Sequence, residues 1–411
     1  MERVNRRAFL RKSAAVAFSI ASVGRAARGG ESSRGVVRCG VIGTGTQGRV
    51  LLSQLSKMEG VEIAALCDIY PPHLKKGLKI ARGNAKTFTD YRRVIEEDLE
   101  AIIIATPPNL HAQMALDALQ AGKHVFCESP LALTVEDCKK VAAAARTAKT
   151  VFQVGHQRRS SPLYRHSLSV VKAGLIGDLQ QVRAQWHINS SWRKPVRDRR
   201  YEKLLNWRLY RESSGGLMGE FGSHQLDIGN WFLGATPVSV MGVGGINRWK
   251  DGREVYDNVQ LIFNYPNGVR MIYSAMLNSS FEGNYEMFIG TAGTILLMGG
   301  RKGLLFKEPD AAAFGWEMYA KKERLGEAEG ILLDANATKL EKKTDTAVVK
   351  AGEERADFYR EMEDFLHAIR EGKDVPCNAE PALKAAVACI RANECMEKGQ
   401  QIQFAEQDFK V

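Results

Sequence analysis

The chain has 411 residues, of which 45% are hydrophobic and 26% are charged, and its formal net charge is +11. This length suits two domains with substantial cores, and the apolar content excludes a disordered chain. No apolar run approaches the roughly 18–20 residues that span a bilayer, which excludes a membrane-spanning protein.

The basic amino-terminal segment carries about half of the positive charge. Residues 1–34 contain eight lysines and arginines and two glutamates, so the remaining surface has only a mild surplus. Arg6 and Arg7 precede Phe9, an uncharged stretch over residues 13–23 and several small residues. This order is typical of a twin-arginine signal, so we expect residues 1–34 to be a signal peptide with its lead-in, and the folded protein to be exported to the periplasm. The alternative is the basic terminus of a cytoplasmic protein.

A strand, a glycine-rich turn, a helix and a second strand follow in order. Residues 36–42 and 61–67 are apolar runs that predict strands, and residues 49–58 have a helical pattern. The turn between them reads Gly43-Thr44-Gly45-Thr46-Gln47-Gly48. Its glycines permit a tight turn, a close backbone approach to a pyrophosphate and close packing of helix on strand. The free N–H groups of the helix amino terminus, including those of Thr46 and Gln47, are expected to face the phosphates.

Asp68 ends the second strand, 20 residues after Gly48. A carboxylate at this position can accept hydrogen bonds from ribose hydroxyls and would repel a 2′-phosphate. The sequence therefore predicts a dinucleotide site that favours NAD over NADP.

Further strands and helices alternate up to about residue 160. Residues 101–105, 124–127 and 151–154 predict strands, and residues 111–121 and 135–148 predict helices. This alternation predicts an α/β fold with a doubly wound parallel sheet, here a Rossmann domain over residues 35–160, with ligands at the carboxyl ends of its strands.

The remainder, residues 161–411, predicts a second domain of the α+β class with an open, mainly antiparallel sheet. Its extended segments are residues 179–188, 238–244, 259–265, 269–277, 285–290 and 294–297. Residues 333–352 are polar and lysine-rich, which favours a surface loop. Residues 354–370 and 381–398 predict two terminal helices that pack back on the first domain.

The seven cysteines show no CxxC pair and no zinc spacing, so we expect no metal site. Several of them lie in apolar runs, which favours buried thiols over a disulfide framework.

Several motifs together resemble the glucose–fructose oxidoreductase, inositol dehydrogenase and MocA (Gfo/Idh/MocA) family. Besides the glycine turn, they are Thr106-Pro107-Pro108-Asn109 with His111, Gly122-Lys123-His124-Val125 leading to Glu128-Ser129-Pro130, and Gly215-Gly216 leading to the segment from Glu220 to Asp227. The resemblance implies that Thr106, Pro107, Asn109, His111 and Glu128 contribute to the cofactor site. It also implies a sugar or cyclitol substrate and a second domain that often mediates homo-oligomers.

Two positions depart from the family pattern. Ser129 stands where the family usually has a lysine that touches the substrate hydroxyl, and a serine supplies a hydrogen bond but no charge. Glu220 replaces the usual aspartate and keeps the carboxylate on a longer stem.

Oxidation of a secondary alcohol needs a base for the hydroxyl proton, and His224 is the best candidate. Glu220 and Asp227 are spaced i−4 and i+3 from His224, so a helix would place all three on one face. Either carboxylate could orient the ring or bind a substrate hydroxyl. The alternative is a structural histidine near a helix start at Ser223.

Substrate contacts are expected from Ser129, from the segment after strand 151–154 and from an aromatic-rich stretch. Gln157 and Arg158 follow that strand at the carboxyl edge, although a solvated face is an equal alternative. Trp192 and Trp207 suit the apolar faces of a sugar, and core or subunit interface is the alternative. No nucleic-acid motif accompanies the arginines in this stretch.

These features predict an NAD-dependent oxidoreductase that acts on a sugar or cyclitol with a tightly held cofactor, since free NAD is scarce outside the cytoplasm. A second hypothesis is an NAD-dependent glycosidase that oxidises, eliminates, hydrates and reduces with no net redox change. A third is a sugar or nucleotide sensor without catalysis.

Overall fold

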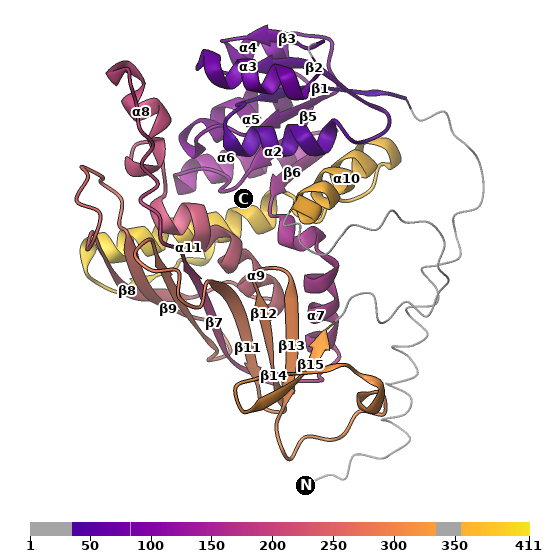
Figure 1. Ribbon diagram of the computed structural model, residues 1–411, viewed down its shortest axis with the longest axis vertical. Coiled ribbons are helices and arrows are strands. Elements are labelled where there is room, and N and C mark those ends of the chain that lie inside the picture. The colour runs from indigo at the N-terminus through magenta and orange to yellow at the C-terminus, as the bar shows by residue number, and fades with distance from the viewer. Residues whose placement is uncertain (1–34, 83, 334–354) are drawn as a thin grey trace. The chain divides into compact units, whose positions relative to one another are not determined.

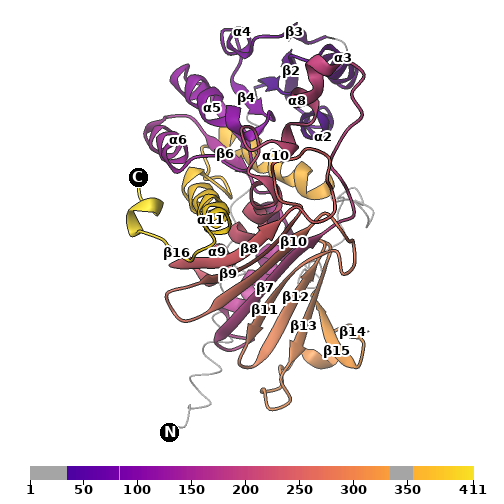
Figure 2. The same cartoon turned by 90° about the vertical axis from the view of Figure 1, so that its left-hand side faces the viewer.

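The computed structural model describes residues 35–82, 84–333 and 355–411. The twin-arginine segment and all but the first residue of the expected surface loop over residues 333–352 lie outside this range. Residues 36–411 form one compact unit, which contains two β-sheets (Figures 1 and 2). None of the helices within the described ranges is long and apolar enough to cross a bilayer.

The first sheet is parallel, as its apolar strands predict. Its order is β3-β2-β1-β4-β5-β6, so the direction of strand addition reverses between β1 and β4. Ligands of such sheets bind at the carboxyl ends of the two strands at this reversal. The strands are β1 (Val37–Ile42), β2 (Val61–Cys67), β3 (Lys86–Phe88), β4 (Ala101–Ile104), β5 (His124–Glu128) and β6 (Phe152–Gly155).

Helices cover both faces of this sheet. They are α2 (Thr46–Leu55), α3 (Pro71–Ile80), α4 (Tyr91–Ile95), α5 (His111–Gln120) and α6 (Val135–Thr147). The predicted start of the first helix at residue 49 is wrong by three residues, because the glycine turn passes directly into α2 and places Gly48 inside the helix. The short elements α3, β3 and α4 were not predicted from the sequence.

The second sheet is larger and mainly antiparallel, which confirms the predicted fold class. Its order is β14-β15-β13-β12-β11-β7-β10-β9-β8-β16, and only the β7–β10 pair is parallel among the pairings described. The strands are β7 (Leu179–His187), β8 (Ser239–Gly245), β9 (Asn258–Asn264), β10 (Arg270–Met276), β11 (Asn284–Gly290), β12 (Gly293–Met298), β13 (Lys302–Lys307), β14 (Lys322–Leu325), β15 (Ala328–Leu333) and β16 (Ile402–Gln403).

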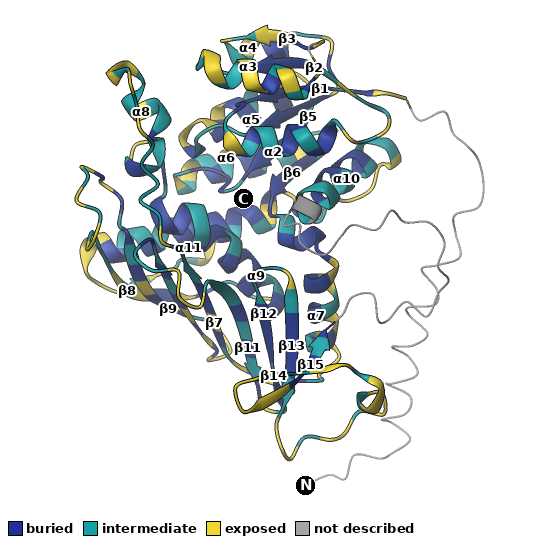
Figure 3. Cartoon of the chain, in the orientation of Figure 1, coloured by how far each residue is buried: buried dark blue, intermediate teal, exposed yellow. Residues whose placement is uncertain are grey.

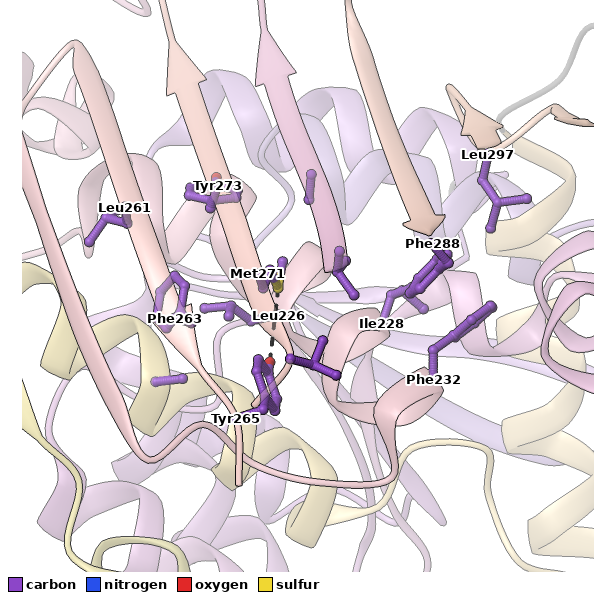
Figure 4. Packing of buried hydrophobic residues seen from close by; sticks show 14 of the residues in the cluster. Leu226, Ile228, Phe232, Leu261, Phe263, Tyr265, Met271, Tyr273, Phe288 and Leu297 are labelled. Carbon is purple, nitrogen blue, oxygen red and sulfur yellow. Dashed lines mark hydrogen bonds between the residues drawn. The ribbon is translucent and has the colours of Figure 1, made fainter. Parts of the chain in front are cut away.

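Helix α9 (Ser223–Leu233) packs against one face of the second sheet (Figure 4). Its residues Leu226 and Phe232 lie among buried side chains of β9, β10 and β11. The Phe232 ring stacks on Phe288 with centroids 4.2 Å apart. Burial of such large apolar side chains fixes the position of α9, and therefore of His224 in its first turn.

The other helices join the two sheets. Helix α7 (Pro162–Lys172) follows β6, and α8 (Glu202–Leu205) interrupts the long connection after β7. Helices α10 (Arg355–Glu371) and α11 (Ala379–Lys398) pack into the cores around the parallel sheet. Many residues of both helices are buried, whereas β14 and the loops on either side of it are largely exposed (Figure 3).

All seven cysteines are free and buried, so the expectation of buried thiols is confirmed. Burial raises the pKa of Cys39 to about 12 and also raises that of Cys127. Thiols of this kind are inert small hydrophobic residues.

Candidate active site

The glycine turn after β1 has the geometry that its sequence predicts. Gly43 has a φ of +90°, and a Cβ there would lie 2.5 Å from the carbonyl oxygen of Ala105 after β4. A Cβ at Gly48 would lie 1.8 Å from the carbonyl oxygen of Gly43. Above Gly45, by contrast, the nearest atom to a Cβ would be His73 Nδ1 at 3.9 Å. A side chain therefore does not fit at Gly43 or Gly48, whereas the space above Gly45 is open.

Helix α2 begins at this opening without a cap. No side chain of the described residues bonds to its first N–H groups, and no acidic residue lies in its first turn. Unpaired N–H groups and the positive end of the helix dipole favour an anion at this point.

Asp68 follows β2 beside the turn and accepts several hydrogen bonds. Thr44 donates from its amide (2.8 Å) and its hydroxyl (3.1 Å), and the amide of Tyr70 donates at 2.8 Å. His73 Nδ1 lies 3.6 Å from the carboxylate. Burial alone would raise the pKa of Asp68, but the hydrogen bonds from His73, Tyr70 and Thr44 lower it below its ordinary value. The group is therefore a fixed anion at the rim of the turn.

A cavity of about 1020 Å³ extends from the glycine turn to the second sheet. It is lined by most of the residues predicted for the cofactor and substrate: Gly43, Gly45, Thr46, Gln47, Asp68, Thr106, Pro107, Glu128, Ser129, Gln157, Arg158, Trp192, Trp207, Glu220 and His224. Four predicted residues do not line it: Gly48, Asn109, His111 and Asp227. The fold thus brings fifteen of the nineteen site residues predicted from the sequence to one cavity.

His111 lies behind the cavity wall rather than in it. Its ring is buried, with Nδ1 2.8 Å from the carbonyl oxygen of Pro130 and Nε2 2.9 Å from that of Thr106. It thereby ties the loop after β4 to the loop after β5. Asn109 is exposed. Any contribution of His111 to cofactor binding is therefore through these loops, and the cofactor role of Asn109 stays a prediction.

His224 lies where the second sheet meets the parallel sheet. A π-helical turn over Met218–Gly222 precedes it, and Nε2 lies 3.3 Å from Ser129 Oγ. Its Nδ1 is buried and has no partner among the described residues. Burial, followed by the nearby His156 and the charge of Arg158, lowers the pKa of His224 well below its ordinary value. The imidazole is therefore neutral near pH 7 and able to accept a proton.

Glu220 shares the cavity wall with His224, as the i,i+4 spacing predicts. Its carboxylate accepts a hydrogen bond of 2.6 Å from Arg208 Nε. The Arg208 guanidinium lies 4.4 Å from the centroid of the Trp207 ring. Arg208 was not predicted, because no spacing rule connects it to Glu220 across a connection of irregular structure.

Asp227 does not share that wall. It is 1% exposed and accepts a bidentate pair of hydrogen bonds from Arg159, between 2.8 and 3.0 Å. The neighbouring Arg158 pairs with the buried Glu286 at 2.7 Å. Both arginines are thus buried and paired, and the alternative of a solvated face is wrong.

Glu128, at the end of β5, is a carboxyl group with an unusually high pKa. Gln47 Nε2 donates to its carboxylate at 2.7 Å. Burial raises the pKa of Glu128 to about 7, because the Gln47 and Ser129 hydrogen bonds only partly offset the loss of water. A carboxyl group that titrates near neutrality is typical of functional sites.

Aromatic rings line the wall of the cavity opposite the glycine turn. Trp186 stacks on Phe221 with centroids 4.7 Å apart, and Trp192 meets the same ring edge-on at 5.3 Å. Trp207 also lines the cavity. These rings offer the flat apolar surface that covers the C–H faces of a sugar.

One group of described residues has the composition of a metal site. Potential ligand atoms of His156, Asp227 and Cys377 lie within 4.8 Å of one another. Arg159 already neutralises Asp227, however, and burial, reinforced by the charge of Asp227, raises the pKa of the Cys377 thiol well above its ordinary value. Asp227 thus already has its counter-ion, and the thiol of Cys377 stays protonated.

The described residues fit a nicotinamide dinucleotide. The open glycine turn and the uncapped helix suit a pyrophosphate, and the Asp68 carboxylate suits a ribose. The cavity is large enough for a dinucleotide and a small substrate together.

Comparisons with known proteins agree with this fit. Residues 37–156 match the family model of an oxidoreductase family with an NAD-binding Rossmann fold, and residues 164–296 match the GFO/IDH/MocA C-terminal domain. The two segments together cover more than half of the chain.

Two curated relatives bear on the chemistry. An inositol 2-dehydrogenase of Salmonella typhimurium is 35% identical over 158 residues, which are 38% of this chain and 47% of the relative. An alpha-N-acetylgalactosaminidase of Shewanella oneidensis is 33% identical over 188 residues, which are 43% of this chain and 39% of the relative. The chain spans about half the length of the curated relatives that it matches.

A solved structure extends the likeness of fold to nearly the whole chain. Levoglucosan dehydrogenase in complex with NADH and L-sorbose superposes with a TM-score of 0.75 at 22% identity. The superposition covers 90% of this chain and 99% of that one.

Proposed function

Because the chain belongs to the Gfo/Idh/MocA oxidoreductase family, we propose that it oxidises a secondary alcohol of a sugar or cyclitol with NAD as hydride acceptor. One observation carries this proposal. A neutral imidazole, His224, shares a single cavity with an open glycine turn and an uncapped helix. The cavity thus combines a base with a dinucleotide site.

His224 is the base in this reaction. Bound NAD supplies the acceptor for the hydride that leaves the alcohol carbon. His224 Nε2 takes the hydroxyl proton, and Ser129 Oγ, 3.3 Å from that nitrogen, hydrogen-bonds the same alcohol or the ring. The lowered pKa keeps the ring in its accepting form at neutral pH.

Glu220 and the aromatic wall hold the substrate. Arg208 fixes one carboxylate oxygen of Glu220, which leaves the other able to accept a hydrogen bond from a sugar hydroxyl. Trp186, Trp192 and Trp207 cover the apolar face of the ring. Two similar proteins, an inositol 2-dehydrogenase and a levoglucosan dehydrogenase, are named for polyhydroxylated ring substrates.

Residues 1–34 support a further part of the proposal. Their twin-arginine pattern favours export in the folded state, so the cofactor would have to be taken up beforehand and kept through many turnovers. Cell fractionation tests this part. If the proposal is correct, the wild-type protein is found in the periplasmic fraction, whereas a variant with Arg6 and Arg7 replaced by lysine stays in the cytoplasm.

A glycosidase is the second candidate, and Ser129 is the observation that favours it. The family lysine would place a charge beside the substrate hydroxyl, whereas Ser129 places a neutral hydroxyl against His224. In a redox-neutral route the sugar is oxidised at one carbon, loses its aglycone by elimination, adds water and is reduced again. An alpha-N-acetylgalactosaminidase is among the similar proteins.

One experiment separates these functions. The purified protein is denatured and assayed for released nicotinamide dinucleotide, and the intact protein is incubated with sugars, cyclitols and glycosides. Accumulation of reduced cofactor with a ketosugar or lactone supports the oxidoreductase. Free sugar from a glycoside without net reduction supports the glycosidase. Dinucleotide binding without turnover, unchanged by His224→Asn, contradicts both and indicates a sensor.

A further inference from the structure

Lys194 is a cation of the cavity that the proposed reaction does not use. It lies in the connection over residues 188–210, between β7 and the π-helical turn, and its side chain lines the cavity. In the sequence, Lys194 belongs to a basic cluster that extends from Arg193 to Arg200. The structure shows that one member of the cluster lies inside the candidate active site.

The backbone at Lys194 is held firmly. Its amide donates to Asn206 Oδ1 at 2.7 Å, and Asn206 Nδ2 donates back to its carbonyl oxygen at 3.1 Å. Asn206 is 1% exposed. Two residues earlier, Trp192 has a φ of +62°, a costly conformation for a residue with a side chain. The surrounding contacts therefore fix the position from which the lysine side chain extends.

The ammonium group of Lys194 has no counter-ion within the described part of the chain. No described residue forms an ion pair or a hydrogen bond with Nζ, whereas four further cations that line the cavity, Arg158, Arg208, Lys302 and Arg360, each pair with a carboxylate. Burial, and then the like charges of Arg208 and Arg49, lower the pKa of Lys194. A half-buried cation beside two others is unfavourable unless an anion joins them.

The neighbours of Lys194 indicate where that anion lies. Arg49 belongs to helix α2, and its Nη1 donates to the carbonyl oxygen of Thr44 in the glycine turn at 2.7 Å. Tyr201, in the same connection as Lys194, packs edge-on against Tyr70 beside Asp68, with centroids 4.9 Å apart. The connection thus reaches the rim of the expected dinucleotide site.

We propose that Lys194 is a binding residue for an anionic group inside the cavity, namely a phosphate of the dinucleotide. An acidic group on the sugar, such as the carboxylate of a uronate, is the other source of the same chemistry. Lys194 would close the site from the second domain, on the side opposite the N–H groups of α2. This inference rests on the proposed function, because it requires that a dinucleotide bind at all.

The test compares Lys194→Met with two controls on protein freed of nucleotide. Lys194→Arg keeps the charge, and Lys203→Met removes a lysine of the same connection that pairs with Glu212 outside the cavity. Calorimetric titration with NADH measures the dissociation constant of each. A charged contact of this kind corresponds to a weakening of about ten- to a hundredfold in Lys194→Met. Lys194→Arg is expected to restore most of the affinity, and Lys203→Met to match the wild type.

The second arm separates the two anions. The loaded proteins are titrated with glucuronate and with glucose. If Lys194→Met keeps the wild-type affinity for NADH but loses binding of glucuronate selectively, the anion belongs to the substrate. NADH affinity and glucuronate preference both within twofold of the wild type in Lys194→Met overturn the inference. A wild-type protein that binds no NADH contradicts the proposed function instead.

Discussion

At the scale of single residues, His224 combines features that a structural histidine does not need. It lines a cavity, its Nδ1 has no described partner, and burial keeps it neutral. The buried His111, by contrast, does not line the cavity and has a backbone carbonyl oxygen within 3 Å of each ring nitrogen.

We expect His224→Asn to lower the turnover number by about a hundred- to ten-thousandfold, because the base for the hydroxyl proton is lost. The affinity for NADH and the unfolding midpoint should change little. Steady-state kinetics and urea unfolding measure these effects, with His367→Asn on α10 as the control. Equal activity in the two variants would remove His224 from the chemistry.

Asp227 is expected to act through stability rather than chemistry. Asp227→Asn leaves the buried Arg159 without its counter-charge, which costs about 3–5 kcal/mol of unfolding free energy. Asp364→Asn is the matched control, because its pair with Arg165 is partly exposed and contributes at most about 1 kcal/mol. A stable Asp227→Asn protein with a collapsed turnover number would contradict this expectation.

Glu128 should make stability depend on pH. Burial raises its pKa from an ordinary 4.5 to about 7, so the folded state binds the proton more tightly than the unfolded state. Wild-type stability therefore falls as the pH rises through this window, and Glu128→Gln avoids that loss. We expect the unfolding free energy of the variant to increase by about 2–3 kcal/mol relative to that of the wild type between pH 5 and pH 8. Urea unfolding of both proteins at the two pH values measures this change. A difference in unfolding free energy that is the same at pH 5 and pH 8 would contradict the raised pKa of Glu128.

The sequence predicted the chemistry of individual residues better than their partners. The glycine turn and the motif around His224 were predictable because their residues lie close together in the sequence, so their spacing indicates the local geometry. The pairs Arg208–Glu220 and Arg159–Asp227 join segments that only the tertiary fold brings together. Asp227 lies three residues after His224 in the same regular helix α9, but its carboxylate pairs with Arg159 and does not line the cavity.

At the scale of elements, the glycine turn and α2 form the rigid part of the site. Gly48→Ala would place a Cβ 1.8 Å from the carbonyl oxygen of Gly43, so the turn or the helix must move. We expect NADH affinity to fall more than about tenfold, since the aligned N–H groups lose their positions. Gly315→Ala is the control, because a Cβ there meets no atom within 4 Å. Equal NADH binding in both variants would contradict this role of the turn.

Elements with strong periodicity or motifs were predictable, and short or irregular ones were not. The continuous apolar runs of β1, β2 and β4 and the two terminal helices were placed within a few residues. Strands β13 to β16 and the connection over residues 188–210 were missed or left without structure, because their conformation depends on tertiary contacts such as the Lys194–Asn206 pair. The connection contributes Lys194, Trp192 and Trp207 to the cavity, so the least predictable segment carries part of the site.

At the scale of the whole molecule, neither sheet forms the site alone. The parallel sheet supplies the glycine turn, Asp68 and Glu128, and the second domain supplies His224, Glu220 and the aromatic wall. Helix α11 buries apolar side chains both in the core of the parallel sheet and in that of the second sheet, and so fixes the two parts to each other. The boundary near residue 160 and the homo-oligomer stay predictions.

A crystal structure of the protein grown with NADH tests the central claim most directly. We expect the pyrophosphate over Gly45 and the first turn of α2, the ribose at Asp68, and the nicotinamide ring next to Glu128 and within reach of His224. A dinucleotide bound elsewhere, or a cavity that stays free of nucleotide at saturating NADH, would contradict the proposed enzyme.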